Sequence, residues 1–129
     1  TYRIYDWDRP NSDGTFRDLH TEEAIDAIDY SAQDSYKTVY SKEQNISSEI
    51  VSCPYFTTNV LPINGEVFIN HEEKDSFVIY MCVAGSVEFK YEDQIENLEM
   101  GETILVPNCV KNIVISSEEK SELLEVYIK

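Results

Sequence analysis

The sequence predicts an all-β protein, an antiparallel β-sandwich with one short helix before it. Two observations lead to this prediction. From residue 49 onward, short segments suited to β-strands recur roughly every ten residues, with turn-forming residues between them. Before that point, apolar residues recur at helical spacing only once, over residues 19–28.

The first element expected is a half-buried strand at the N-terminus. Side chains alternate in character from Tyr2 to Asp6, as they do on a strand with one face toward a core. The turn formers of residues 10–14 then end it.

A helix is expected next, over residues 22–29. Thr21 is the expected N-cap, and Glu22 and Glu23 place carboxylates in the first turn, where they meet the positive end of the helix. Residues 30–48 are polar without a clear period, which indicates a long surface connection.

The sandwich is expected from Glu49 to Lys129, within one domain of a chain of 129 residues. Its breaks are turn sequences such as Pro62-Ile63-Asn64-Gly65 and Met100-Gly101-Glu102. The candidate strands are residues 50–56, 56–61, 65–70, 76–84, 86–91, 94–98, 102–106, 112–116 and 122–128.

The charge balance excludes two classes of partner. The chain has 10 Lys and Arg against 25 Asp and Glu, a net charge of −15. Such a chain repels phosphate backbones and anionic membranes, so we expect neither nucleic acid nor membrane as a partner. The only arginines are Arg3, Arg9 and Arg17, and their shared location suggests a site for anionic oxygens.

The three cysteines, Cys53, Cys82 and Cys109, are odd in number and lack a CxxC spacing. Cys82 lies inside the longest apolar run and is expected to be a small core residue. Free thiols and the lack of a signal peptide favour a cytoplasmic protein.

Residues 77–106 have a more specific order. An apolar strand ends at Gly85, a hairpin strand follows, and Leu98-Glu99-Met100-Gly101-Glu102 precedes a strand that ends in Val106-Pro107. This order resembles the core of the cupin jelly roll. In metal-binding cupins a histidine pair and a glutamate precede this stretch and another histidine follows it, whereas this chain has only His71 before it.

The chain has two histidines, His20 and His71. His71, beside Glu72 and Glu73, could be a ligand for zinc or iron, but we favour a solvated loop residue. His20, at the helix entrance, is expected to be structural. No Cys, His and Asp stand in an order that suggests nucleophilic catalysis, and we expect no metal in this chain.

The N-terminal text carries a sharper resemblance. Residues 1–9, TYRIYDWDR, and residues 17–26, RDLHTEEAID, resemble class I mannose-6-phosphate isomerase of the short bacterial type, and the likeness runs through the cupin part to Lys129. The resemblance implies an aldose–ketose isomerase that interconverts mannose 6-phosphate and fructose 6-phosphate. Its zinc is held by Gln or Glu and His residues of an N-terminal cupin domain.

None of those zinc ligands transfers to this sequence, which begins with Thr1 inside strand-like text. We therefore expect an excised C-terminal portion. Residues 1–48 are the strand, helix and linker that lead out of the missing catalytic domain, and residues 49–129 are the C-terminal cupin-like sandwich. The sugar phosphate is bound through the missing domain, and the fragment alone is expected to be inactive.

One catalytic residue follows from the resemblance. The arginine of the family's T-Y-R motif points into the active site and assists proton transfer, and by position it is Arg3. A guanidinium can stabilise the charge of an enediolate, so the role is chemically sound. Arg9 and Arg17 are expected to be structural.

An alternative of another class stays open. A metal-free cupin could bind sugars or other small ligands without chemistry, as a sensor or regulatory module. The TYRIYDWDR segment favours the isomerase, because a binding module has no need of a strand that completes the site of another domain.

Overall fold

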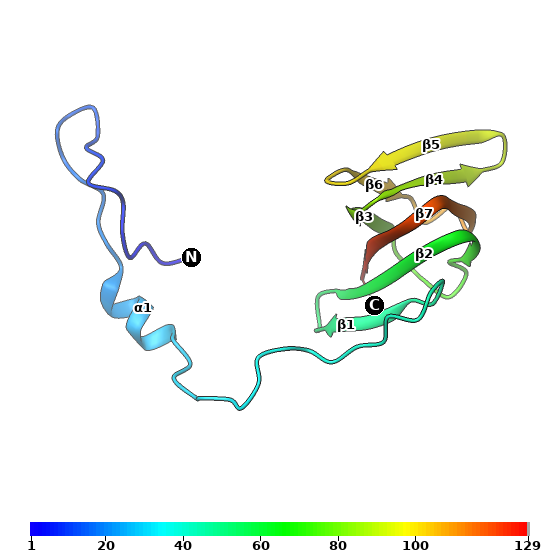
Figure 1. The fold of residues 1–129 in the computed structure, drawn as a ribbon. Coiled ribbons are helices and arrows are strands. Elements are labelled where there is room, and N and C mark those ends of the chain that lie inside the picture. The colour runs from blue at the N-terminus through cyan, green and yellow to red at the C-terminus, as the bar shows by residue number, and fades with distance from the viewer. Residues whose placement is uncertain (129) are drawn as a thin grey trace. The chain divides into compact units, whose positions relative to one another are not determined.

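The computed structural model describes residues 1–128, which form two compact units (Figure 1). The first unit is Thr1–Tyr36, and the second begins at Lys37. No helix among the described residues is long and apolar enough to cross a membrane.

The second unit is an antiparallel β-sandwich, which confirms the predicted all-β fold. Within residues 1–128 it has the strands β1 (Ser48–Ser52), β2 (Thr57–Asn70), β3 (Val78–Ala84), β4 (Ser86–Tyr91), β5 (Gln94–Glu99), β6 (Thr103–Val106) and β7 (Asn112–Tyr127).

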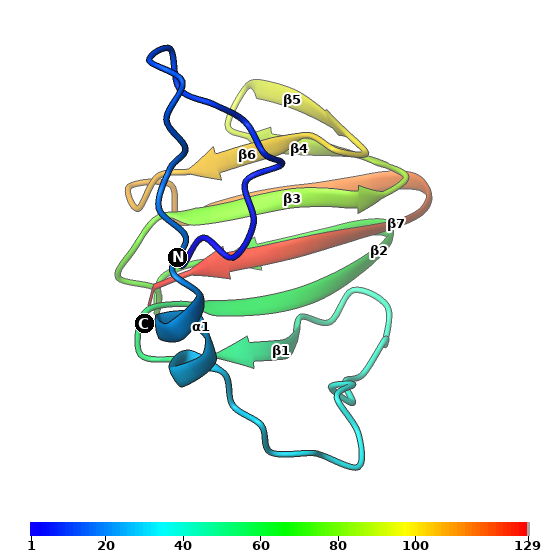
Figure 2. The same ribbon diagram turned by 90° about the vertical axis from the view of Figure 1, so that its left-hand side faces the viewer.

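Two long strands connect the two layers of the sandwich. β2 and β7 pair with each other along nearly their whole lengths. Their halves 57–63 and 121–127 belong to the sheet β1-β2-β7-β3-β6, whose strands lie side by side in Figure 2. Their other halves, 65–70 and 112–117, continue into β4 and β5.

The merging of strands corrects the prediction of separate segments at 56–61 and 65–70, and at 112–116 and 122–128. The register shifts between Ile63 and Gly65, opposite Ser121 and Ser117, without ending either strand. Gly65 has φ +77°, which a residue without Cβ adopts at little cost. The turn formers of residues 62–65 therefore make a bulge that bends both strands.

The core lies between the two layers. Its buried side chains come from the inward-facing positions of β2, β3, β4, β5, β6 and β7, and Cys82 is among them, as predicted. At the edge of the core, a Cβ on Gly85 would lie 2.3 Å from Ser121 Oγ, and φ there is +72°. This position therefore requires glycine. The core residues are Leu61, Ile63, Val78, Tyr80, Cys82, Val87, Phe89, Leu98, Val106, Ile113, Ile115 and Leu123.

The first unit contains the predicted helix, α1 (Thr21–Ala27), which ends two residues earlier than expected. The N-cap is His20 and not Thr21, and no side chain caps the helix. None of residues 1–36 is buried. The domain limits 1–48 and 49–129 stay predictions.

The strand predicted from Tyr2 to Asp6 is wrong. Residues 1–20 form no strand within the described chain, and Trp7 and Asp8 have φ of 50° and 49°, outside the extended region. A strand needs a partner with matching backbone groups. Here the pairing is limited to one point, between Arg3 and His20.

Candidate functional site

Arg3, the predicted catalytic residue, is held by the segment just before α1. Its backbone N–H donates to Nδ1 of His20 at 3.1 Å, and its carbonyl accepts from the backbone N–H of His20 at 2.7 Å. Its guanidinium Nη1 donates to the carbonyl of Asp18 at 2.7 Å. Two hydrogen bonds thus fix the main chain of Arg3 and a third fixes its half-buried side chain, so that a residue far from α1 in sequence lies next to its start in space.

The guanidinium keeps most of its donors available. An arginine carries five N–H donors. Within residues 1–128, the Asp18 carbonyl is the only hydrogen-bond acceptor of this guanidinium. The remaining donors suit a planar anionic oxygen ligand.

A second pair of residues, Arg17 and Asp6, also connects the N-terminal segment with the segment just before α1. Arg17 Nε donates to Asp6 Oδ2 at 2.8 Å, and Arg17 Nη2 bonds to Asp6 Oδ1. This hydrogen-bonded guanidinium lowers the pKa of Asp6. Arg17 thus has a structural contact, in keeping with the role expected for it. Arg9 is exposed, and its side chain makes no hydrogen bond or ion pair within the described residues.

The sandwich contains a buried polar cluster around Glu125, which no pattern in the sequence predicted. Glu125 of β7 is 3% exposed, and its carboxylate accepts four hydrogen bonds. Ser47 Oγ and Asn59 Nδ2 each donate to Oε2 at 2.8 Å, whereas Tyr80 OH, at 2.9 Å, and Lys74 Nζ donate to Oε1. Burial acts to raise the pKa of Glu125, but Lys74 and the neutral donors outweigh it and the pKa is lowered.

His71 belongs to this cluster, so the prediction of a solvated loop residue is wrong. The side chain is 3% exposed, and Nε2 lies 2.8 Å from Tyr80 OH. Burial, with the nearby Lys74 ammonium, lowers the pKa of His71. The backbone N–H of His71 donates to the Lys111 carbonyl at 2.7 Å, which draws the loop into the sandwich.

These residues do not fit a metal ion such as zinc. The Glu125 carboxylate is already shared among four donors, one of which is the ammonium of Lys74. That ammonium also lies 4.3 Å from the centre of the Tyr127 ring. Among residues 1–128, no group of three or more His, Cys, Asp or Glu side chains could hold a metal.

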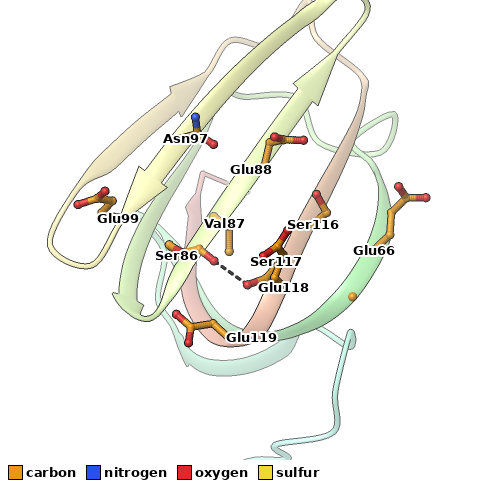
Figure 3. Close-up of a pocket in the computed structure, with 11 residues that line it drawn as sticks. Glu66, Ser86, Val87, Glu88, Asn97, Glu99, Ser116, Ser117, Glu118 and Glu119 are labelled. Carbon is orange, nitrogen blue, oxygen red and sulfur yellow. Dashed lines mark hydrogen bonds between the residues drawn. The ribbon is translucent and has the colours of Figure 1, made fainter.

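A hollow of about 870 Å³ lies on the outer face of β2, β7, β4 and β5 (Figure 3). Glu88 pairs with Ser116 of β7 and Asn97 of β5, while its neighbours Val87 and Phe89 face the core. At one end, Ser117 Oγ donates to the Ser86 carbonyl at 2.6 Å. Five glutamates line the hollow, so it repels a sugar phosphate: Glu66, Glu88, Glu99, Glu118 and Glu119.

The antiparallel sandwich, in which β2 and β7 run through both layers, defines the class of the second unit: it is a cupin domain. A cupin-2 domain protein from Shewanella frigidimarina matches 68% of the chain with a TM-score of 0.60 at 17% identity, and 84% of that protein is covered. Residues 46–128 match the family described as "Mannose-6-phosphate isomerase, cupin domain". The chain belongs to this family.

Likeness to isomerases extends beyond the sandwich. YvyI of Bacillus subtilis, whose name assigns it provisionally to the mannose-6-phosphate isomerases, is 34% identical over 117 residues, 89% of this chain and 36% of that protein. The crystal structure of a mannose 6-phosphate isomerase from Bacillus subtilis matches 98% of this chain and 40% of its own, with a TM-score of 0.72 and 29% identity. The chain spans little more than a third of the curated relative.

Proposed function

We propose that the chain is the C-terminal part of a zinc-dependent mannose-6-phosphate isomerase that interconverts mannose 6-phosphate and fructose 6-phosphate. Two findings support this. The chain belongs to the cupin-domain family of that enzyme. Its match to an isomerase structure also includes residues before the sandwich, where Arg3 is held.

The observation that carries the proposal is the state of the Arg3 guanidinium. An aldose becomes a ketose when a proton moves between adjacent carbons, and negative charge develops on the enediolate oxygens during that transfer. A fixed guanidinium with free donors stabilises such charge without reorganising during the reaction. Arg3 is fixed by His20 and Asp18 and uses one of its donors.

In this proposal, zinc is bound by residues outside this chain. The described residues do not fit zinc, so we place the zinc ligands and most of the substrate contacts outside this chain. It follows that the 129-residue chain alone is inactive. We also propose a cytoplasmic location, because the three cysteines are free thiols.

The alternative function, a metal-free module that binds sugars or other small ligands, has weaker support. At the cluster around Glu125, the carboxylate inside the sandwich already accepts hydrogen bonds from Asn59 and Tyr80. The hollow on the outer face is lined by carboxylates, which disfavour a phosphorylated ligand.

The test is an assay of the intact protein for mannose 6-phosphate isomerisation, with and without a chelator. Arg3→Ala should lower kcat by about 100- to 1000-fold, while KM changes little, because the charge acts mainly in the transition state. Arg3→Lys should recover little of the lost kcat, since the compact ammonium of lysine does not reproduce the planar arrangement of donors on a guanidinium.

Arg9→Ala is the matched control, because it removes an exposed arginine whose side chain makes no hydrogen bond or ion pair in the described residues. It should keep the activity of the natural protein. Thermal melts of each variant separate lost chemistry from lost folding. A stably folded Arg3→Ala enzyme with undiminished turnover would refute the assignment of Arg3.

A further inference from the structure

We infer that His20 is a positioning residue for Arg3: its imidazole Nδ1 fixes the main chain from which the guanidinium extends. The inference rests on the proposed function and adds a second residue to it. His20 itself has no assigned contact with substrate, so its effect acts through Arg3.

The two residues form a closed pair of hydrogen bonds. Arg3 N–H donates to His20 Nδ1 at 3.1 Å, and His20 N–H donates to the Arg3 carbonyl at 2.7 Å. In an antiparallel ladder a backbone carbonyl would accept the first of these bonds. Here a side-chain nitrogen replaces that carbonyl, so the pairing depends on the identity of residue 20.

The bond also defines the state of the imidazole. A backbone N–H can only donate, so Nδ1 must carry a lone pair and the ring proton is on Nε2. The Tyr2 ring meets the imidazole edge-on, with ring centres 6.3 Å apart, which restricts its rotation.

Both ends of the Arg3 side chain are thereby tied to one short segment. His20 fixes the main chain, and the Asp18 carbonyl fixes Nη1. The carbonyl of His20 in turn accepts from the N–H of Ala24 at 3.0 Å, so this segment continues into the first turn of α1. Without Nδ1, the main chain of Arg3 keeps a single bond and the direction of the guanidinium is less well defined.

A purely helical role would not use the imidazole. His20 is the N-cap of α1, but no side-chain capping bond is made. The effect of the side chain on Arg3 can therefore be tested separately from the stability of the helix.

The experiment compares His20→Leu with His20→Asn in the intact protein. The two replacements have nearly the same shape, but Asn presents an acceptor oxygen on Cγ, where histidine carries Nδ1. His20→Leu should lower kcat by about 10- to 100-fold with little change in KM, as expected when a catalytic group is displaced by about 1 Å. His20→Asn should regain most of this loss.

Two further variants identify the cause. Ala24→Gly weakens α1 but leaves Nδ1 in place, so it should keep kcat. In an Arg3→Ala background, His20→Leu should cause no further loss of kcat, because its effect acts through Arg3.

The outcomes separate the inference from the proposed function. If Arg3→Ala lowers kcat but His20→Leu does not, the inference is wrong and the proposed function stands. Equal losses for Ala24→Gly and His20→Leu, or for His20→Asn and His20→Leu, also overturn it. If Arg3→Ala has no effect, both are wrong.

Discussion

The charge of Glu125 should make Lys74 important to the stability of the sandwich. Lys74→Met keeps the length of the side chain but removes the cation that, alone among residues 1–128, bonds to the 3% exposed carboxylate of Glu125. Removing one partner of a buried ion pair typically costs about 3–5 kcal/mol. Three neutral donors remain on Glu125, and the Lys74 side chain is itself 18% exposed. We therefore expect a loss at or just below the lower limit of this range, about 2–3 kcal/mol at pH 7.

The pH dependence gives this prediction a distinctive signature. In the natural chain the pKa of Glu125 is lowered on folding, so its contribution is present above the unfolded value of 4.5 and is lost as the pH falls through the folded value. In Lys74→Met, burial no longer has an ammonium to oppose it, and the pKa of Glu125 should rise. The difference in the free energy of unfolding between the variant and the natural chain should therefore decrease as acid protonates Glu125.

Urea unfolding of the chain, followed by far-ultraviolet circular dichroism from pH 7 to pH 4.5, measures this deficit. The double variant Lys74→Met/Glu125→Gln should recover a large part of it at pH 7, because no buried charge is left unpaired. A loss below about 0.5 kcal/mol at pH 7, or a deficit that neither acid nor the second substitution reduces, would refute the reasoning.

Two further predictions concern the same domain. Folding lowers the pKa of His71 below its ordinary value of 6.5, so the stability that this residue contributes is present above pH 6.5 and is lost as the pH falls through the folded pKa. The urea midpoint should therefore decline less between pH 7 and pH 5 in His71→Asn than in the natural chain. An equal decline would contradict this. Gly85→Ala should lower the free energy of unfolding by about 2 kcal/mol or more, because φ is positive there and the new Cβ would collide with Ser121. Gly65→Ala is the matched control: φ is also positive at Gly65, but no atom lies near the new Cβ, so the loss should be clearly smaller. Equal losses in the two variants would show that the contact with Ser121 does not contribute to the loss of stability.

Much of the sandwich could be read from the sequence, because a strand with one buried face must alternate its side chains. That alternation located the strands from β1 to β7, and the apolar run placed Cys82 in the core. The same alternation places Glu125 on the inward face of β7, together with Leu123. Its role was not predictable, because an isolated glutamate on a strand shows no sign of the lysine, tyrosine and asparagine that surround it in the folded chain.

Other features depended on contacts between distant residues. The motif TYRIYDWDR identified Arg3 by resemblance, but only the folded chain brings Arg3 to His20 and Asp18. The same segment looks like a strand and is not one, since alternation describes the faces of a strand and does not supply a hydrogen-bonding partner.

The sequence by itself therefore determined the fold class and the approximate position of each strand, because these follow from local periodicity and composition, whereas the candidate arginine was identified by the resemblance of its motif to a known family. The tertiary structure decided that β2 and β7 run through both layers, that His71 is buried against Tyr80, and that His20 holds Arg3. Each of these rests on a partner at least nine residues away along the chain, and local patterns contain no information about such a partner.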